Sequence, residues 1–340
     1  MSNPFFSWSV TLNLLFALCI SNICHADLLN QCEPYALTSE YRVGSFEGQP
    51  NTSIAITTTV LNPGPALPAW LDYHLRWAQH VLIYMDDPDE RTIFQQLCGD
   101  RPVTLLDGSR IEPQMTPESR LIRRQMANMR HAIPYLMERN YIWLLHIDVD
   151  ELLFGPSIES GNWAKDPEVG LVTFTNHEAL PVDFETSDPF RDCVYFWVNG
   201  IDHNANFLAY GNGKSAVRLG AAVEPRGAHS FSGHIGRTFK CQEEEAVILH
   251  YPYPSYNSWL RKFKFYSKFS DHWFGDRRAP KIMDFMLHSR DVVQKARMTG
   301  DWANVKEFFS RRILDPESRK YAISEGRVRH YTPFTNPRKL

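Results

Sequence analysis

Two aspartates, Asp148 and Asp150, directly follow an apolar run that begins at Tyr141. A near-continuous apolar run of this length is typical of a strand buried on both faces of a parallel sheet. Side chains two apart on a strand point to the same side, so two carboxylates are expected side by side at the strand end. Such a pair is costly without a positive charge. A divalent cation held by oxygen ligands is the natural candidate, and two ordinary surface acids are the alternative.

A second acidic pair, Asp86 and Asp87, follows the apolar run 81–85. Ligands of open α/β sheets bind at the carboxyl ends of the strands, which share one rim. One pair could therefore contact ribose hydroxyls while the other holds a metal on a diphosphate. The alternative for Asp87 is an Asp-Pro turn with Pro88. The sequence has no glycine-rich phosphate loop, so nucleotide phosphates would need a cation and Arg or Lys side chains.

The stretches around these acids alternate between strand and helix patterns. Strand patterns at 53–61, 81–85 and 103–106 are separated by helical patterns at 68–79 and 91–97. This β-α-β-α-β order predicts a parallel sheet with right-handed crossovers. Further strands are expected at 141–150, 170–174, 193–198, 215–219 and 246–251, including an antiparallel edge.

A long helix is expected to begin at Thr116-Pro117, because Thr is a good N-cap and Pro a good first helical residue. Pro134 is expected to kink this helix or end it early. One face is apolar. The other faces carry Arg123, Arg124, Gln125, Asn128 and Arg130.

The composition is that of an ordinary globular protein, with 340 residues, 43% hydrophobic and 22% charged. A net charge of −3 argues against a nucleic-acid partner. From about Ser258 the chain becomes basic, aromatic and helical in pattern, which predicts a solvated helical extension or, less directly, an acceptor or membrane-surface contact. The expected units are 1–26, an N-terminal arm at 27–52, an α/β domain at 53–257, and the basic helical C-terminal extension at 258–340.

Residues 1–26 contain no Lys, Arg, Asp or Glu, and Leu12 to Ile20 form a short apolar core. Small residues at Cys24 and Ala26 suit cleavage after Ala26, so the segment resembles a secretory signal peptide, with an uncleaved N-terminal anchor as the alternative. The protein is therefore expected in the lumen of the secretory pathway, in the Golgi or secreted. Membrane contact is expected only if the segment is kept as an anchor.

Four cysteines remain after removal of that segment. An even number in a secretory context predicts two disulfides, and buried free thiols are the alternative. Asn51 opens an N-glycosylation sequon, which suits a luminal surface loop. The four cysteines are Cys32, Cys98, Cys193 and Cys241.

Five blocks of the sequence form a recognisable set: Ala69–Leu75, similar to an E-W-x-x-Y-H helix with Ala69 in place of the acid, His80–Asp87, Trp143–Leu153, Gly213–Ser215 ahead of His229, and His250-Tyr251 followed by Lys262. Together they resemble a GT-A glycosyltransferase, near glycosyltransferase family 92 and the related family-2-like group once known only as a domain of unknown function. The resemblance runs from about residue 54 to 265, and it implies a three-layer α/β fold with a mostly parallel central sheet.

The resemblance implies that Asp148, Asp150 and His250 bind Mn²⁺ or Mg²⁺ on the diphosphate of a UDP-sugar. His229 is the alternative to His250. A core histidine with one satisfied nitrogen is the structural alternative for His250. All three proposed ligands are then expected to converge on one point.

The resemblance also places Thr59 and Asp86 at the nucleoside end of the donor and brings Arg123 or Arg124 to the nucleotide. Lys214 would approach a phosphate, with an exposed structural lysine as the alternative. An inverting transfer needs one general base, and Glu178 and Asp183 are the candidates.

Loop-surface acids are the alternative for both Glu178 and Asp183. The family's glycine-rich pattern is absent at 176–180, which leaves the acceptor side less defined. The expected function is transfer of a sugar from a nucleotide sugar to a glycan or glycoconjugate acceptor. The alternatives are a metal-dependent phosphoester hydrolase, which would need a second cluster of ligands, and a non-catalytic carbohydrate-binding pseudo-transferase.

Overall fold

An eight-stranded sheet forms the body of the protein, in the order β1-β4-β3-β2-β5-β10-β7-β13. The computed structural model describes residues 40–43, 53–108, 117–200, 206–265, 269–272, 277–278 and 281–335. The strands of this sheet are β1 (Glu40–Val43), β2 (Ile54–Val60), β3 (His80–Met85), β4 (Val103–Asp107), β5 (Trp143–His146), β7 (Val169–Phe174), β10 (Lys214–Arg218) and β13 (Arg237–Lys240).

Most strands of the large sheet run in one direction. Strands β4, β3, β2 and β5 are mutually parallel, β10 is antiparallel to β5 and β7, and β13 is parallel to β7. Only β1 and β10 therefore run against the other strands described. The expected mostly parallel α/β sheet is confirmed, although β10 lies inside the sheet rather than at its edge.

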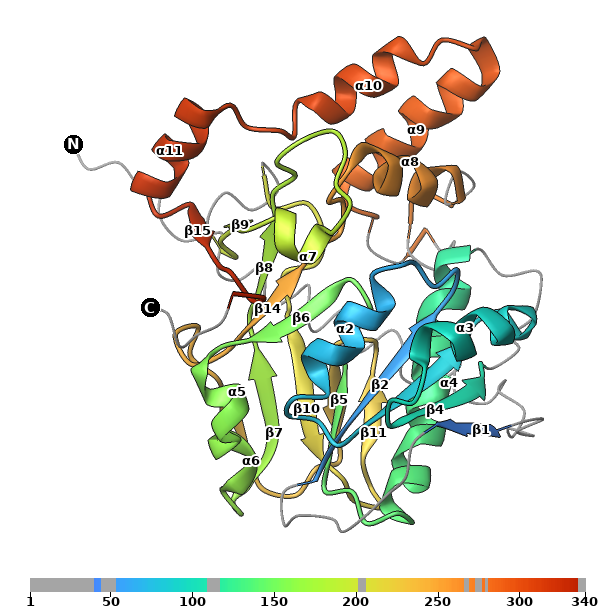
Figure 1. Cartoon of the computed structure of the whole chain (residues 1–340), viewed down its shortest axis with the longest axis vertical. Coiled ribbons are helices and arrows are strands. Elements are labelled where there is room, and N and C mark those ends of the chain that lie inside the picture. The colour runs from blue at the N-terminus through green and yellow to red at the C-terminus, as the bar shows by residue number, and fades with distance from the viewer. Residues whose placement is uncertain are drawn as a thin grey trace.

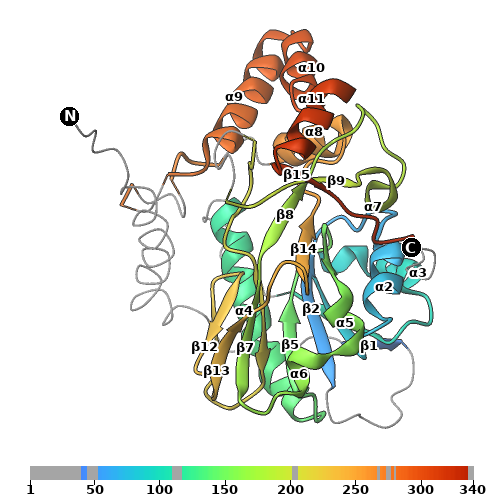
Figure 2. The ribbon, with the colours of Figure 1, turned by 90° about the vertical axis from the view of Figure 1, so that its left-hand side faces the viewer.

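Helices cover both faces of this sheet, which gives three layers (Figure 2). On β3, Leu82 packs in the cluster of the long helix α4 (Pro117–Met137), and its neighbour Ile83 packs in the cluster of α2 (Leu67–His74) and α3 (Arg91–Cys98). Successive strand residues face opposite sides, so an unbroken apolar strand supplies both cores. The three-layer arrangement is compatible with a GT-A-like fold.

A second sheet has five strands in the order β15-β9-β8-β14-β6. It lies above the large sheet in Figure 1, with the C-terminal helices α8 to α10 at the top. The sequence did not predict this second sheet. Its strands are β6 (Glu151–Phe154), β8 (Asn176–Ala179), β9 (Tyr195–Trp197), β14 (Val247–His250) and β15 (Val328–His330).

The C-terminal extension is helical, as expected, but its end returns to the second sheet through β15, which pairs with β9. Buried aromatic side chains such as Trp259, Phe263 and Phe309 form a separate core under its helices. The helices of the extension are α8 (Tyr256–Phe265), α9 (Asp284–Thr299), α10 (Ala303–Ser310) and α11 (Pro316–Ser324). The smaller elements are the 3-10 helix η2 (Pro88–Glu90), α5 (Pro156–Ser160), α6 (Asn162–Lys165), α7 (Pro189–Asp192), β11 (Glu224–Arg226) and β12 (Ser230–Ser232).

The central strand is shorter than predicted, since β5 ends at His146 and the acids lie on the turn between β5 and β6. The Glu151 N–H donates to the Asp148 carbonyl at 3.1 Å, and the Asp148 N–H donates to Glu151 Oε2 at 2.7 Å. The expected strand through 150 is therefore wrong, and the strand alternation that was to place Asp148 and Asp150 on one side does not apply.

The long helix continues past Pro134 to Met137, so the prolyl residue does not end it. Pro134 is exposed and lies in the last turn, where its ring can be accommodated with the loss of one helical hydrogen bond.

The prediction of two disulfides is wrong, because Cys98, Cys193 and Cys241 are all free and buried. Burial raises the pKa of these thiols, to about 11 for Cys98 and Cys241 and about 12 for Cys193. The thiolate is the reactive form, so these side chains are inert core residues. Cys32 lies outside the described residues.

No helix within the described ranges combines the length and apolar character needed to cross a bilayer. The proposed signal peptide or anchor at 1–26 and the sequon at Asn51 both lie outside those ranges and stay predictions.

Candidate functional site

Two of the predicted nucleotide-binding residues meet the polar face of α4 at the rim where β2 and β3 end. Asn128 Nδ2 donates to Thr59 Oγ1 at 2.8 Å, and Arg124 pairs with Asp86 at 2.9 Å. The helix therefore fixes both side chains at the ends of neighbouring parallel strands, which is where ligands of open α/β sheets bind. Arg123 is half-buried beside them, and its Nε has no hydrogen-bond partner among the described residues.

Asp87, the other acid of this pair, has a local role. Its carboxylate accepts a hydrogen bond from the Asp89 N–H at 3.0 Å and caps η2. The turn interpretation of Asp87-Pro88 is therefore confirmed, and Asp86 alone belongs to the candidate site.

Asp148 is held between α4 and β10. Gln125 Nε2 donates to its Oδ1 at 2.8 Å, and Lys214 Nζ lies 2.6 Å from its Oδ2. The Lys214 side chain is 0% exposed and also lies 3.2 Å from Glu151 Oε2. Lys214 is thus a buried partner of Asp148 and Glu151 and does not reach the surface, where it was expected to approach a phosphate.

Burial and neighbouring charges determine the protonation states of Asp148, Lys214 and Glu151. Burial opposes ionisation of Asp148, but Lys214 and His146 outweigh it and hold the pKa of Asp148 well below its usual range. Burial likewise disfavours the Lys214 ammonium, yet Asp148 and Glu151 raise its pKa. Burial raises the pKa of Glu151 to about 8 despite Lys214, and Glu151 accepts a hydrogen bond from the Tyr210 hydroxyl. A neutral Glu151 leaves Lys214 and Asp148 as one compensated ion pair.

Asp150 and His250 form the second half of the site. His250 Nε2 lies 3.8 Å from Asp150 Oδ2, and Lys262 Nζ lies 3.7 Å from the same oxygen. Burial and the nearby Lys262 keep the pKa of His250 well below its ordinary value, so the imidazole is neutral. The Tyr251 N–H donates to the Asp150 carbonyl at 2.8 Å, which ties the turn to the end of β14.

The Asp150–His250 pair fits a divalent cation better than Asp148 does. A neutral imidazole is the ligand form of histidine, and the His250 nitrogen that faces Asp150 is Nε2, 3.8 Å from Oδ2. Both carboxylate oxygens of Asp148 are already engaged by Gln125 and Lys214. No group of three His, Cys, Asp or Glu side chains in the described ranges is arranged for a metal ion. The structure brings two of the three predicted ligands together, and the three-ligand site stays a prediction.

His229, the alternative ligand, lies behind Tyr210. Its Nδ1 is 2.9 Å from the Gly213 carbonyl, and its ring centroid is 4.4 Å from that of Tyr210. Tyr210 also contacts His250, since their ring centroids are 4.8 Å apart, so the Tyr210 ring links the two histidines. Burial lowers the pKa of His229 to about 3. The contact with Asp150 distinguishes His250 as the better candidate.

The two candidate general bases, Glu178 and Asp183, lie in different environments. Glu178 lies on β8, and its backbone is paired with that of His250, which is also paired with Glu151. Residues paired across neighbouring strands share a face, so the three side chains form one row. Burial raises the pKa of Glu178 to about 8, although backbone N–H groups oppose this. Asp183 is exposed, and its carboxylate accepts from the Phe184 N–H at 2.6 Å.

Sequence reasoning did not assign roles to five side chains of this site. The helical spacing of polar residues on α4 could have indicated Gln125 and Asn128, and the run of three acids could have indicated Glu151. Lys262 belongs to the last block of the family resemblance, which assigned it no role, and Tyr210 had no local signal; tertiary contacts bring both to the site.

No protein-family model matches the chain. A protein of Arabidopsis thaliana named Glycosyltransferase-like At3g57200 is 30% identical over 40% of this chain and 31% of its own length. Another, Glycosyltransferase-like At2g41451, is 31% identical over 40% of this chain and 35% of its own length. The match thus spans about a third of each relative. HddC of Yersinia pseudotuberculosis, a solved structure, covers 58% of this chain and 92% of its own with 10% identity and a TM-score of 0.32, a likeness too slight for any argument.

The similarity to two proteins named glycosyltransferase-like supports the glycosyltransferase class that the sequence blocks resemble. The relatives' names specify neither a sugar nor an acceptor.

Proposed function

We propose that this protein transfers a sugar from a nucleotide sugar, in our proposal a UDP-sugar, to a glycan or glycoconjugate acceptor. The observation that carries the proposal is the pair of Asp150 and His250, 3.8 Å apart, on the same rim as Asp86 and Thr59. Relatives named glycosyltransferase-like support the class.

Thr59 and Asp86 bind the nucleoside end in this proposal, because they lie at the carboxyl ends of β2 and β3, and Arg124 of α4 joins them through its pair with Asp86. Asp150 and His250 would hold Mn²⁺ or Mg²⁺ against the diphosphate. Such an ion supplies positive charge that stabilises the leaving nucleotide. Lys214 keeps Asp148 ionised and fixed, and Asp148 lies on the same turn as Asp150.

Glu178 is the proposed base that takes the proton from the acceptor hydroxyl. Its backbone is paired with that of His250, so it lies close to the proposed diphosphate end, whereas Asp183 is exposed on a loop. A carboxylate within hydrogen-bond reach of the hydroxyl can remove its proton as the sugar is transferred. The lumen of the secretory pathway stays the proposed location.

A turnover assay tests this proposal. Purified protein is incubated with a panel of UDP-sugars, Mn²⁺ and mixed glycan acceptors, and released UDP is measured. Asp150→Asn is expected to lower the activity at least 100-fold. The control Asp291→Asn removes an exposed carboxylate on α9 and should leave the activity unchanged. Full activity of Asp150→Asn would overturn the assignment of Asp150. Absence of UDP release with every sugar, together with hydrolysis of simple phosphate esters, would favour a hydrolase.

A further inference from the structure

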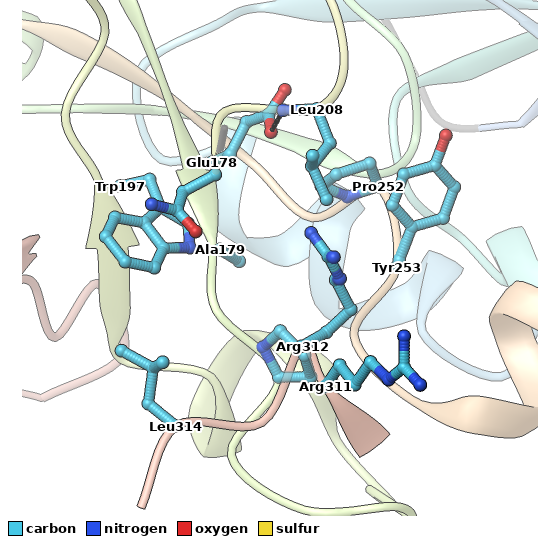
Figure 3. Close-up of a pocket in the computed structure, with 11 residues that line it drawn as sticks. Glu178, Ala179, Trp197, Leu208, Pro252, Tyr253, Arg311, Arg312 and Leu314 are labelled. Atoms are coloured by element: carbon cyan, nitrogen blue, oxygen red, sulfur yellow. Dashed lines mark hydrogen bonds between the residues drawn. The ribbon is translucent and has the colours of Figure 1, made fainter. Parts of the chain in front are cut away.

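A hollow opens between the second sheet and the C-terminal extension, apart from the Asp150–His250 pair. Its floor is formed by Glu178 of β8 and Trp197 of β9, and its other walls by Tyr253 and the segment that follows α10, with Arg311 and Arg312 (Figure 3). Its enclosed cavity is small, about 30 Å³, and the space including the open solvent at its mouth is about 440 Å³. We call it the C-terminal hollow.

Arg312 lines the C-terminal hollow, and its guanidinium lies over the Phe285 ring at 5.2 Å but has no anionic partner among the described residues. In Figure 3 its side chain extends toward Pro252 and Leu208, between Glu178 and Tyr253. Its Nε is buried and has no hydrogen-bond partner, and it forms no ion pair within the described ranges. A buried polar group of this kind costs free energy until it finds a partner, and a planar guanidinium fits a carboxylate or phosphate with two hydrogen bonds.

Arg311 adds a second positive charge at the mouth. Its side chain is 66% exposed, runs outward in Figure 3, and pairs with Glu307 at 2.7 Å. Repulsion between neighbouring arginines and burial both disfavour the charged form of Arg312, and its pKa is lowered. An anion bound between them would relieve this repulsion.

Glu178, the one acid that lines the C-terminal hollow, does not neutralise these arginines. Its two carboxylate oxygens accept hydrogen bonds from the Leu208 and Ala209 N–H groups, each at 2.6 Å. Burial raises its pKa to about 8, so at neutral pH it is mostly uncharged. Since Glu307 pairs with Arg311, the uncompensated charge of the hollow is the guanidinium of Arg312.

The aromatic walls suit a sugar ring. Trp197 and Tyr253 both line the C-terminal hollow, where 9% of Trp197 and 6% of Tyr253 remain exposed beside the polar groups. Ligand pockets typically combine such apolar walls with a few placed polar groups. A ring with an anionic substituent satisfies both parts of this surface.

We propose that the C-terminal hollow binds an anionic saccharide, that is, a sugar carrying a carboxylate or a phosphate, through Arg312. The position of the hollow makes this sugar part of the acceptor, and that assignment rests on the proposed function. Tyr253 follows His250 by three residues, and Glu178 is paired with His250 in the sheet. A hydroxyl of the bound saccharide can therefore lie beside Glu178, next to the proposed donor site.

A binding titration of the full chain, monitored by saturation-transfer NMR, tests the proposal. The three probes are methyl β-D-glucuronide, glucose 6-phosphate and methyl β-D-glucoside. We expect at least one anionic sugar to bind much more tightly than the neutral glucoside, and the tighter of the two identifies carboxylate or phosphate. Arg312→Gln should weaken that binding roughly 10- to 100-fold, the range of a charge-assisted hydrogen bond to a buried partner. Arg261→Gln, an exposed arginine on α8, is the matched control and should leave it unchanged.

A second variant keeps the test decisive if Arg312→Gln does not fold. Arg311→Gln alters an exposed side chain, and we expect it to fold and to weaken binding of the anionic sugar a few-fold. Equal binding of the three sugars, or unchanged binding in both Arg311→Gln and Arg312→Gln, would overturn the proposal. UDP binding by the unmodified protein is measured separately, so its absence would reject the proposed function while leaving the anion site to be judged by its own result.

Discussion

Lys214 accounts for the main difference between the acidic turn expected from the sequence and the one in the structure. The sequence indicated a carboxylate pair in need of a cation, and the structure supplies a buried ammonium to Asp148, with Glu151 as its second partner. Asp150 is left as the acid that faces His250. The two aspartates therefore have separate roles, one internal and one available to a ligand.

Replacing Lys214 by Met should strongly destabilise the protein. The change leaves the Asp148 charge without its buried partner, and breaking a buried ion pair costs about 3–5 kcal/mol in the free energy of unfolding. Urea unfolding measures this loss. The double variant Asp148→Asn with Lys214→Met removes both charges and should recover part of the stability. Equal stability of Lys214→Met and the unmodified protein would show that the ion pair has no structural role.

Glu178 should control the pH dependence of turnover. A base must be ionised, and burial raises the pKa of Glu178 to about 8, so kcat/KM should rise as the pH increases from 6 to about 8 and then level off. The pH profile of UDP release measures this. Glu178→Gln should lose most of the activity, whereas Asp183→Asn should keep both the activity and the rising limb. A profile that is flat from pH 6 to 9, or loss of activity in Asp183→Asn instead, would reject Glu178 as the base.

At the scale of elements, α4 organises the proposed donor side. Its residues Arg124, Gln125 and Asn128 contact three different strand ends, and its apolar face packs on the large sheet. This arrangement follows from helical periodicity, which places residues three and four apart on one face.

A prolyl residue in the last turn of α4 should limit its stability. Pro134 is exposed and lacks the N–H that would continue the helical hydrogen bonds. Pro134→Ala should therefore raise the free energy of unfolding by about 1–3 kcal/mol, since proline is about 3 kcal/mol less favourable than alanine in a helix interior. Thermal unfolding followed by circular dichroism tests this. A lower melting temperature in the variant would mean that the ring makes contacts that the helix needs.

The parallel half of the fold was predictable, because apolar strands and amphipathic helices alternate locally from residue 53 to Met137. The second sheet was not, since β14 pairs with β6 and β8, which come from distant parts of the chain. The same limit applies to the site: Asp148 and Asp150 were visible in the sequence, whereas the partners Lys262 and Tyr210 depend on tertiary contacts.

At the scale of the whole molecule, buried acids and buried histidines give the free energy of unfolding opposite dependences on pH. Burial raises the pKa of both Glu151 and Glu178 to about 8, so the folded protein keeps protons that the unfolded chain releases. Their contribution is complete at low pH and is lost as the pH rises toward 8. Five buried histidines have lowered pKa values: about 3 for His74 and His229, about 4 for His146 and His177, and well below the ordinary value for His250.

Stability should therefore peak near pH 6.5. The unfolded chain takes up histidine protons below the ordinary histidine pKa of about 6.5, so stability falls there as the pH drops, because the five histidines outnumber the two glutamates. Above pH 6.5 only the glutamates titrate, and stability should fall again toward pH 8. Urea unfolding from pH 5 to 8.5 measures the curve, and Glu178→Gln should flatten its alkaline side. A steady rise in stability through pH 8 would contradict these protonation states.

The central claim is that the Asp150–His250 pair binds the diphosphate of a nucleotide through a divalent cation. Isothermal titration of UDP into the protein, with Mn²⁺ and then with EDTA, tests it most directly. The account predicts that UDP binds with Mn²⁺, that EDTA weakens binding at least tenfold, and that Asp150→Asn and His250→Gln each weaken the Mn²⁺-dependent binding at least tenfold while Asp291→Asn does not. No UDP binding under any condition, or binding that is indifferent to Mn²⁺ and to both substitutions, would contradict it.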